Sequence, residues 1–184
     1  MQTSTLTTTK WAIDATHSEV QFKVKHLVIT TVTGQFKTFS GTVEAENDDF
    51  RGAKIEFTAD ADSLTTGNDA RDGHLKSDDF FNAAEYPQLS FKSTDLVKKS
   101  NERYVLKGNL TIRNFTKAVE LDVEFNGTQK DPFYGKTKAG FEINGKINRK
   151  EFGLKWDVLT EAGGAVVSEE VKIHANIQLV KIEE

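Results

Sequence analysis

The run V-E-L-D-V-E-F at residues 119–125 alternates apolar and acidic side chains without interruption. Val119, Leu121, Val123 and Phe125 fall on one face of an extended chain, and the three acids fall on the other. Successive side chains of a strand point to opposite faces of a sheet, so this period of two predicts a half-buried strand. One face of the strand is therefore expected to cover an apolar interior while the other lies in water.

Seven further runs share this alternation, at residues 20–24, 39–45, 53–61, 89–93, 104–112, 139–147 and 171–179. Eight strands with one wet face each predict antiparallel pairing around a common interior. A sandwich and a barrel both satisfy the pattern, and a barrel is favoured because closure leaves no exposed ladder edge. The predicted fold is all-β: an eight-stranded antiparallel up-and-down barrel in a single domain over residues 1–184, with residues 1–9 disordered or loosely held.

Small residues recur at inward positions of these runs, namely Ala59, Gly108, Ala139, Gly145 and Ala175. An eight-stranded barrel has an interior just wide enough for one small ligand. The small side chains either leave space that phenylalanine and isoleucine line, or they taper and bend the strands at barrel corners. The chain has thirteen phenylalanines against two tryptophans and three tyrosines, and this favours an apolar cavity.

The strands are interrupted by N-D-A-R-D-G-H-L-K-S-D-D-F-F-N-A-A at residues 68–84. Ser77 precedes two acids, which is typical of a helix N-cap with a favourably charged first turn. Gly73 is expected to separate this helix from an earlier turn. We therefore predict a short helical insertion around residues 68–84 that holds Phe80 and Phe81 against the barrel rim.

Two histidines, His17 and His74, have candidate carboxylate partners in Asp14 and Asp72. A general base needs such an orienting partner and a substrate within hydrogen-bond reach. Structural hydrogen bonding of both histidines is the favoured interpretation. Contact with a ligand headgroup and acid/base catalysis are the alternatives.

Composition excludes several classes of function. A net charge of −4 and a pI near 5.7 argue against a nucleic-acid partner. The chain has no cysteine, and its four histidines show neither H-x-H nor H-E-x-x-H spacing, so no metal site is expected. Motifs of the G-x-S-x-G, P-loop and G-x-G-x-x-G types are absent, so no catalytic residue and no cofactor is predicted.

Residues 1–10 carry neither a basic n-region nor an apolar h-region. No apolar run approaches the roughly 18 residues of a membrane span. The sequence thus predicts a cytoplasmic protein without an integral membrane segment. A periplasmic location is the alternative if a leader has been removed.

Several motifs together resemble the YceI-like family, in the family's order along nearly the whole chain. They are W-A-I-D-A-T-H-S-E-V-Q-F-K-V-K-H (11–26), G-Q-F-K-T-F-S-G-T-V (34–43), R-D-G-H-L-K-S-D-D-F-F-N (71–82) with the following Y-P and F-K-S, G-N-L-T-I-R-N-F-T (108–116) and I-N-R-K-E-F-G-L (147–154). The resemblance implies an extended lipocalin-like barrel whose pore binds a polyisoprenoid, an isoprenoid quinone or a fatty-acid-like chain. It also implies a non-catalytic role in carriage, storage or sensing, and a homodimer. The early G-x-W of true lipocalins is absent, so membership of that family is not implied.

Carried onto this sequence, the resemblance gives two sets of candidate site residues. The tunnel candidates are the apolar residues Phe22, Phe36, Phe39, Ile55, Phe57, Phe80, Phe81, Phe91, Leu110, Phe141 and Ile143. The rim or headgroup candidates are His17, Arg71, Asp72 and His74. Two other functions stay open: a barrel enzyme that uses His74 and Asp72 on an isoprenoid or fatty substrate, and a stress-associated interaction protein with a filled interior.

Overall fold

The computed structural model describes residues 7–46, 49–159 and 166–183, and these residues contain an eleven-stranded antiparallel sheet. The strands are β1 (Thr9–Ile13), β2 (Glu19–His26), β3 (Thr30–Phe36), β4 (Phe39–Ala45), β5 (Lys54–Asp60), β6 (Leu64–Thr65), β7 (Gln88–Lys98), β8 (Arg103–Ile112), β9 (Phe115–Lys130), β10 (Thr137–Asn148) and β11 (Glu170–Ile182). The helices are α1 (Asp69–Lys76) and the 3-10 turns η1 (Ala15–His17), η2 (Ala61–Ser63) and η3 (Arg149–Phe152).

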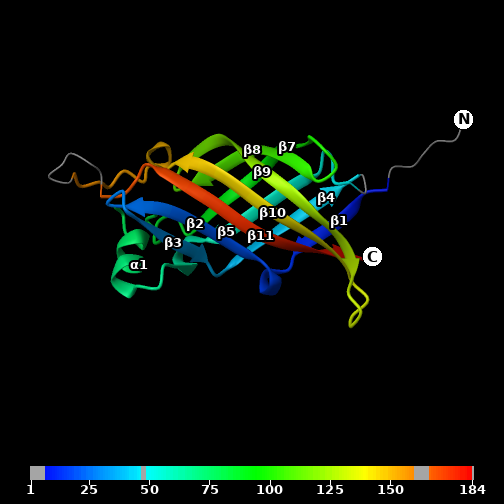
Figure 1. Cartoon of the computed structure of the whole chain (residues 1–184). Helices are drawn as coiled ribbons and strands as arrows, with labels where there is room; N and C mark the ends of the chain where they lie inside the picture. The colour runs from blue at the N-terminus through cyan, green and yellow to red at the C-terminus, as the bar shows by residue number, and fades with distance from the viewer. Residues whose placement is uncertain (1–6, 47–48, 160–165, 184) are drawn as a thin grey trace, which may run out of the picture.

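Eight of these strands close into a barrel in the order β1-β4-β5-β7-β8-β9-β10-β11, with β11 pairing back to β1. Ala12 of β1 shows the closure, because it pairs with Thr42 of β4 on one side and with Val180 of β11 on the other. Figure 1 shows the tilted strands around their common interior. The predicted eight-stranded antiparallel barrel is confirmed.

One strand of the barrel differs from the sequence prediction. The prediction counted residues 20–24, which belong to β2, as a barrel strand, whereas β1 takes that place in the closed ring. The long strand β11 has two partners: Leu179 pairs with Ile13 of β1, and Ala175 pairs with Val20 of β2. Strands β2, β3 and β6 form a branch outside the closed ring. The segment Thr9–Ile13 was missed because Trp11 is its only buried residue and its sequence does not alternate.

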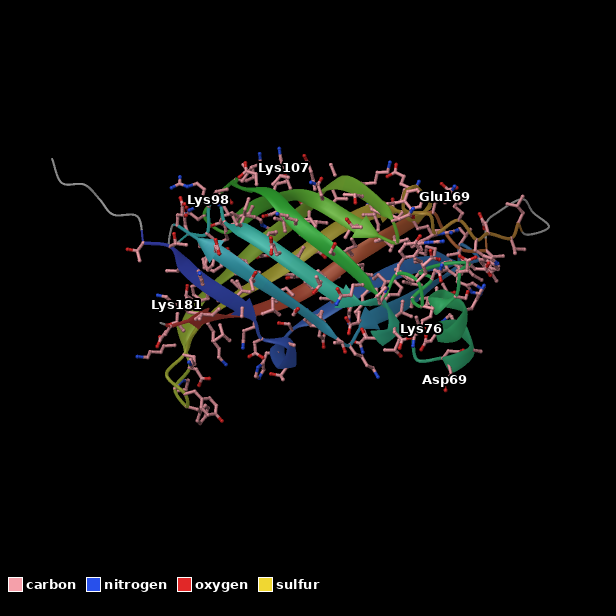
Figure 2. The ribbon with its side chains drawn as sticks, turned by 180° about the vertical axis from the view of Figure 1, so that it is seen from behind. Asp69, Lys76, Lys98, Lys107, Glu169 and Lys181 are labelled. Carbon is pink, nitrogen blue, oxygen red and sulfur yellow. The ribbon has the colours of Figure 1, made fainter. Side chains whose placement is uncertain are left out.

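In the other strands, the faces that the alternation predicts to be apolar do point inward. In β8 the inward positions from Tyr104 to Ile112 are all buried, as strict alternation requires. Figure 2 shows charged side chains such as Lys107 on the outer surface. Asn126-Gly127 is a dipeptide typical of turns, but both residues lie inside β9 and the ladder shifts register there. Asn126 is the extra residue of a β-bulge, which sequence alone does not distinguish from a turn.

The helical insertion is confirmed, but its start was predicted incorrectly. Asn68 is the N-cap of α1, with its Oδ1 accepting a hydrogen bond from the Arg71 amide at 3.0 Å. Gly73 lies inside the helix, and Ser77 is the C-cap. Both Asn68 and Ser77 are suitable cap residues, and only the packing of the insertion selects between them.

The two ends of the barrel are built differently (Figure 1). We call the end that carries α1 and the β2–β3 hairpin the mouth end, and the end with both chain termini the terminal end. At the terminal end the ring of buried Phe50 lies 5.2 Å from Trp11 and 5.1 Å from Phe141. The predicted loose segment lies largely outside the described residues, although Thr9 pairs with Ala45. Within the described part of the chain, no helix is long and apolar enough to span a bilayer.

Candidate functional site

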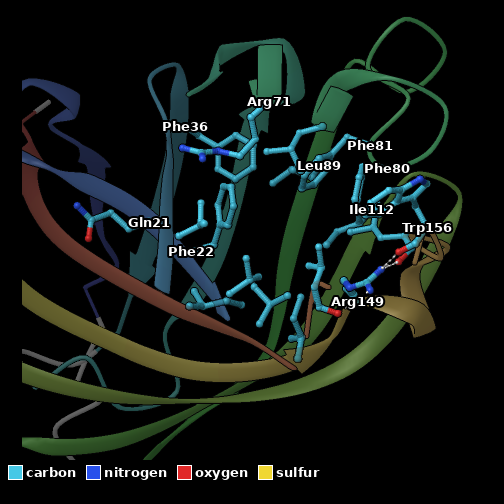
Figure 3. A pocket seen from close by; sticks show the side chains of 18 of the residues that line it. Gln21, Phe22, Phe36, Arg71, Phe80, Phe81, Leu89, Ile112, Arg149 and Trp156 are labelled. Carbon is cyan, nitrogen blue, oxygen red and sulfur yellow. Dashed lines mark hydrogen bonds between the residues drawn. The ribbon is translucent and has the colours of Figure 1, made fainter. Parts of the chain in front are cut away.

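A cavity of about 320 Å³, which we call the outer chamber, lies inside the mouth end of the molecule. Its walls come from β2, β3, β7, β8, β10, β11, α1 and the connection that follows η3. Figure 3 shows Phe22, Phe36, Phe80 and Phe81 projecting into it. Most lining residues are apolar, and the cavity has the size typical of small-molecule sites. The polar lining residues are Gln21, Lys25, His26, Arg71, His74 and Arg149.

A second cavity of about 130 Å³, the inner chamber, lies nearer the terminal end and is bounded there by Phe50. Its lining includes Ile55, Phe57 and Phe141. Val20 and Ile173 line both chambers, so the two spaces adjoin along the barrel. Two apolar chambers that adjoin along the barrel suit an elongated apolar molecule.

Aromatic packing fixes one wall of the outer chamber. The Phe36 ring lies 5.7 Å from Phe22 and 5.9 Å from Phe81, with the second pair edge to face. Such offset geometries are favourable for aromatic pairs. Phe22 lies over Gly34 on the neighbouring strand, and a Cβ atom at that position would overlap the ring.

Helix α1 is anchored to the barrel through a buried carboxylate. Asp72 Oδ1 accepts a hydrogen bond from the Thr66 amide at 2.8 Å and another from the Thr66 hydroxyl, while Oδ2 accepts one from Thr65. Burial by itself would raise the pKa of Asp72, but these hydrogen bonds favour the ionised form and the pKa is lowered. The anchor places the Arg71 and His74 side chains at the outer chamber.

Polar groups at the mouth are held by local contacts. Arg71 donates from Nε to the Thr66 hydroxyl at 2.7 Å and from Nη2 to the Thr66 carbonyl at 2.9 Å. His74 Nε2 lies 2.8 Å from Asp79 Oδ2, and the imidazole packs edge-on against Trp156 at 4.9 Å. The His74–Asp72 pair considered for catalysis therefore does not form, because each residue has another partner.

Arg149 is a buried cation that lines the outer chamber. Its guanidinium donates to the backbone carbonyls of Leu154, Trp156, Val167 and Ser168. Burial lowers the pKa of Arg149, while the charges of Asp157 and Glu169 act in the opposite direction. The arginine guanidinium stays protonated in proteins. Its hydrogen bonds hold Leu154 and Trp156, and also Val167 and Ser168, at the chamber.

The predicted site residues divide according to their position. The outer chamber is lined by Phe22, Phe36, Phe80, Phe81, Leu110, Arg71 and His74, and the inner chamber by Ile55, Phe57, Phe91, Phe141 and Ile143. Phe39 instead packs against Phe57 at 6.1 Å. Asp72 anchors α1, and His17 is exposed in η1 with its Nδ1 2.8 Å from Asp14.

The inward glycines were predicted to leave space for a ligand, but side chains of neighbouring strands occupy that space. A Cβ at Gly108 would overlap the Phe91 ring, and one at Gly145 would overlap the Leu121 side chain. These glycines therefore accommodate large neighbours on the next strand. Ala175 does line the inner chamber, so only part of the predicted set opens space.

Sequence reasoning missed Phe50, Trp156 and Arg149 as lining residues. Phe50 and Trp156 lie in connections without periodicity, and Arg149 lies in η3, beyond the alternating run at residues 139–147. No local signal separates Arg149 from Lys150, since both stand in the polar run N-R-K-E and only the fold buries Arg149.

The histidine sites have no metal-binding geometry. Among the described residues, no group of three or more histidine, cysteine, aspartate or glutamate side chains is placed to hold a metal ion. At the His17 site, burial would raise the pKa of Asp14, but hydrogen bonds from Thr16 and His17 and the His17 charge lower it to about 2. The structural interpretation favoured for His17 agrees with these contacts.

Fold and cavity together define an antiparallel β-barrel with adjoining internal apolar chambers. The sequence profile of the YceI-like domain matches residues 11–179, and the chain belongs to the YceI-like family. A UPF0312 protein of Staphylococcus aureus (strain bovine RF122 / ET3-1) is 37% identical over 170 residues, covering 92% of this chain and 96% of that protein.

Solved structures agree with this assignment. The YCEI protein of Campylobacter jejuni superposes with a TM-score of 0.73 at 33% identity, covering 88% of this chain and 91% of that one. A polyisoprenoid binding domain from Saccharophagus degradans superposes with a TM-score of 0.65 at 16% identity, covering 94% and 98% of the two chains. The second comparison is informative about the fold alone.

Proposed function

We propose that this protein binds one long apolar lipid, with a prenyl or acyl tail, in the outer and inner chambers. The observation that carries the proposal is the pair of adjoining apolar chambers of about 320 and 130 Å³. The similarity of fold to a domain described as polyisoprenoid binding supports it. The role is non-catalytic carriage, storage or sensing.

The proposed orientation puts the tail inside and the polar end at the mouth. Of the four predicted rim residues, Arg71 and His74 line the outer chamber and are assigned to the headgroup, whereas Asp72 anchors α1 and His17 lies in η1 beside Asp14. Burial of each methylene contributes about 0.8 kcal/mol, so a few isoprene units reach micromolar affinity after ordering costs. Apolar contacts alone discriminate tail length poorly, so chamber depth and the mouth residues set selectivity.

The test is organic extraction and mass spectrometry of the purified protein, beside a Val24→Asp variant. Val24 lines the outer chamber from the peripheral strand β2, so a carboxylate there opposes a tail without disturbing the closed ring. We expect lipid in the wild type and in the apolar control Val24→Leu, and none in a folded Val24→Asp. A folded Val24→Asp variant that keeps its lipid would contradict the proposal.

The enzyme alternative has less support, since the acid/base pair that it requires is not formed. The filled-interior alternative conflicts with the two chambers. The homodimer, the quinone ligand, the single-domain organisation and the cytoplasmic location stay predictions.

A further inference from the structure

We infer that the tip of the β2–β3 hairpin, together with Val158 and Leu159, docks on an anionic lipid bilayer. This docking surface consists of Leu27, Val28, Ile29, Val158 and Leu159, which are all exposed. The exposed fractions of Val28, Ile29 and Leu159 are 73, 78 and 70%. The Val166 amide donates to the Val158 carbonyl at 2.9 Å and the Leu27 amide donates to the Val166 carbonyl, so the two groups lie side by side. Exposed apolar side chains gathered in this way indicate an interaction site.

The docking surface is continuous with the mouth of the outer chamber. The Leu27 amide donates to the Val166 carbonyl at 2.9 Å, and His26 forms a β-bridge with Val167. His26, Val166 and Val167 all line the chamber. A lipid that leaves a bilayer beneath the hairpin tip would therefore pass from membrane to chamber along apolar contacts.

The backbone of the tip gives an independent indication of function. Leu27 and Val28 have φ values of 51° and 66°, in the left-handed region. Hairpin turns with two such residues strongly favour Asn-Gly, and a β-branched residue there is an outlier. The tip thus keeps two apolar residues that neither burial nor turn geometry explains, and strain of this kind concentrates at functional sites.

Charge selects the type of bilayer. Lys23 and Lys25 lie in β2 just before the tip, and the acids near the other half of the docking surface, Asp157 and Glu169, are paired with Lys150. An apolar tip flanked by lysines combines insertion below the headgroups with attraction to anionic lipid. An anionic bilayer matches both features, whereas a second copy that meets this chain through the same tip would bring lysines against lysines.

The experiment measures flotation of the whole protein with vesicles of phosphatidylglycerol and phosphatidylcholine, and with vesicles of phosphatidylcholine alone. The Leu27→Asn/Val28→Gly variant installs the turn residues that the backbone prefers, so it keeps the fold while removing the apolar tip. We expect the wild type to bind anionic vesicles, with binding weakened by salt, and the variant to bind about tenfold less.

The matched control is Phe133→Ser/Tyr134→Ser, which removes the exposed aromatic pair (88 and 82% exposed) from the β9–β10 connection at the terminal end. This variant is expected to bind vesicles like the wild type. Wild-type protein that ignores anionic vesicles, or loss of binding in the terminal-end variant instead, overturns the inference. Loss of a dimer in the Leu27→Asn/Val28→Gly variant without any vesicle effect identifies a second copy as the occupant and also overturns it.

This inference goes beyond the proposed function and depends on it only for the direction of lipid transfer. Lipid extracted from the chamber, with no vesicle binding, removes the docking surface and leaves the proposed function. Vesicle binding by a protein that contains no extractable lipid removes the proposed function and leaves the docking surface.

Discussion

The two ends of the barrel solve the same closure problem with different interactions. At the terminal end, β1 pairs on both sides, and backbone hydrogen bonds complete the ring. At the mouth end the sheet stops at β6, and side chains such as Asp72 and Arg149 tie the covering segments to backbone groups. The larger chamber lies at the mouth end. A cover held by a few side chains can open locally at less cost than a strand ladder, as a binding site requires.

The largest expected effect is from Arg149→Met, which keeps the bulk of the side chain and removes its charge and donors. Four backbone carbonyls would lose their partner in a buried place. We expect the free energy of unfolding to fall by about 3–5 kcal/mol, measured by urea denaturation. The control is Lys150→Met, next in the chain, whose ammonium pairs with Asp157 and Glu169 at the surface and should matter far less. Equal losses in both variants would contradict the role given to Arg149.

The next prediction tests the inner chamber separately from the outer one, with a variant that fills the inner chamber alone. Ala175→Phe places a ring in the inner chamber, which Ala175 lines. Affinity for long-tailed ligands should then fall roughly tenfold for every two methylenes excluded, with short tails unaffected. Competition titrations with tails of graded length measure this. Asn176→Phe, on the water-facing side of the same strand, is the control, and equal loss for short and long tails would show that the inner chamber holds no tail.

Asp72→Asn tests the anchor of α1. The amide cannot accept all the hydrogen bonds that the carboxylate accepts from Thr65 and Thr66, so the loss is about 1–2 kcal/mol. Hydrogen exchange should accelerate in α1 and stay unchanged in β9. The exposed first-turn acid Asp69 supplies the control as Asp69→Asn, and uniform acceleration throughout the barrel would show that the anchor is not local.

The smallest effect is the acid response of Asp14, which lies between β1 and η1. The pKa of Asp14 is lowered to about 2 in the folded protein from 3.8, so its contribution is complete above about pH 5 and is lost progressively as the pH falls through 3.8 and then 2. Asp14→Asn should therefore destabilise the protein by about 1 kcal/mol at neutral pH and have no effect below pH 2. Denaturation at several pH values measures this, with the exposed Asp122→Asn as control. A pH-independent difference would mean that the Asp14 charge is irrelevant.

Much of the barrel was predictable because its strands repeat one local rule. In β8 and β9 alternation identified the buried residues, and most tunnel candidates do line a chamber. Strand β1 was not predictable, because a single buried Trp11 has no period and only pairing with β4 and β11 makes the segment a strand.

The sequence by itself determined which strand faces are apolar, since that depends only on the order of residues along each run. Only the tertiary structure decided which strands close the ring, that Asp72 and Arg149 serve the mouth as anchors, and that Phe91 and Leu121 occupy the space beside Gly108 and Gly145. These outcomes depend on contacts between residues distant in the chain, and a local pattern does not contain those distances.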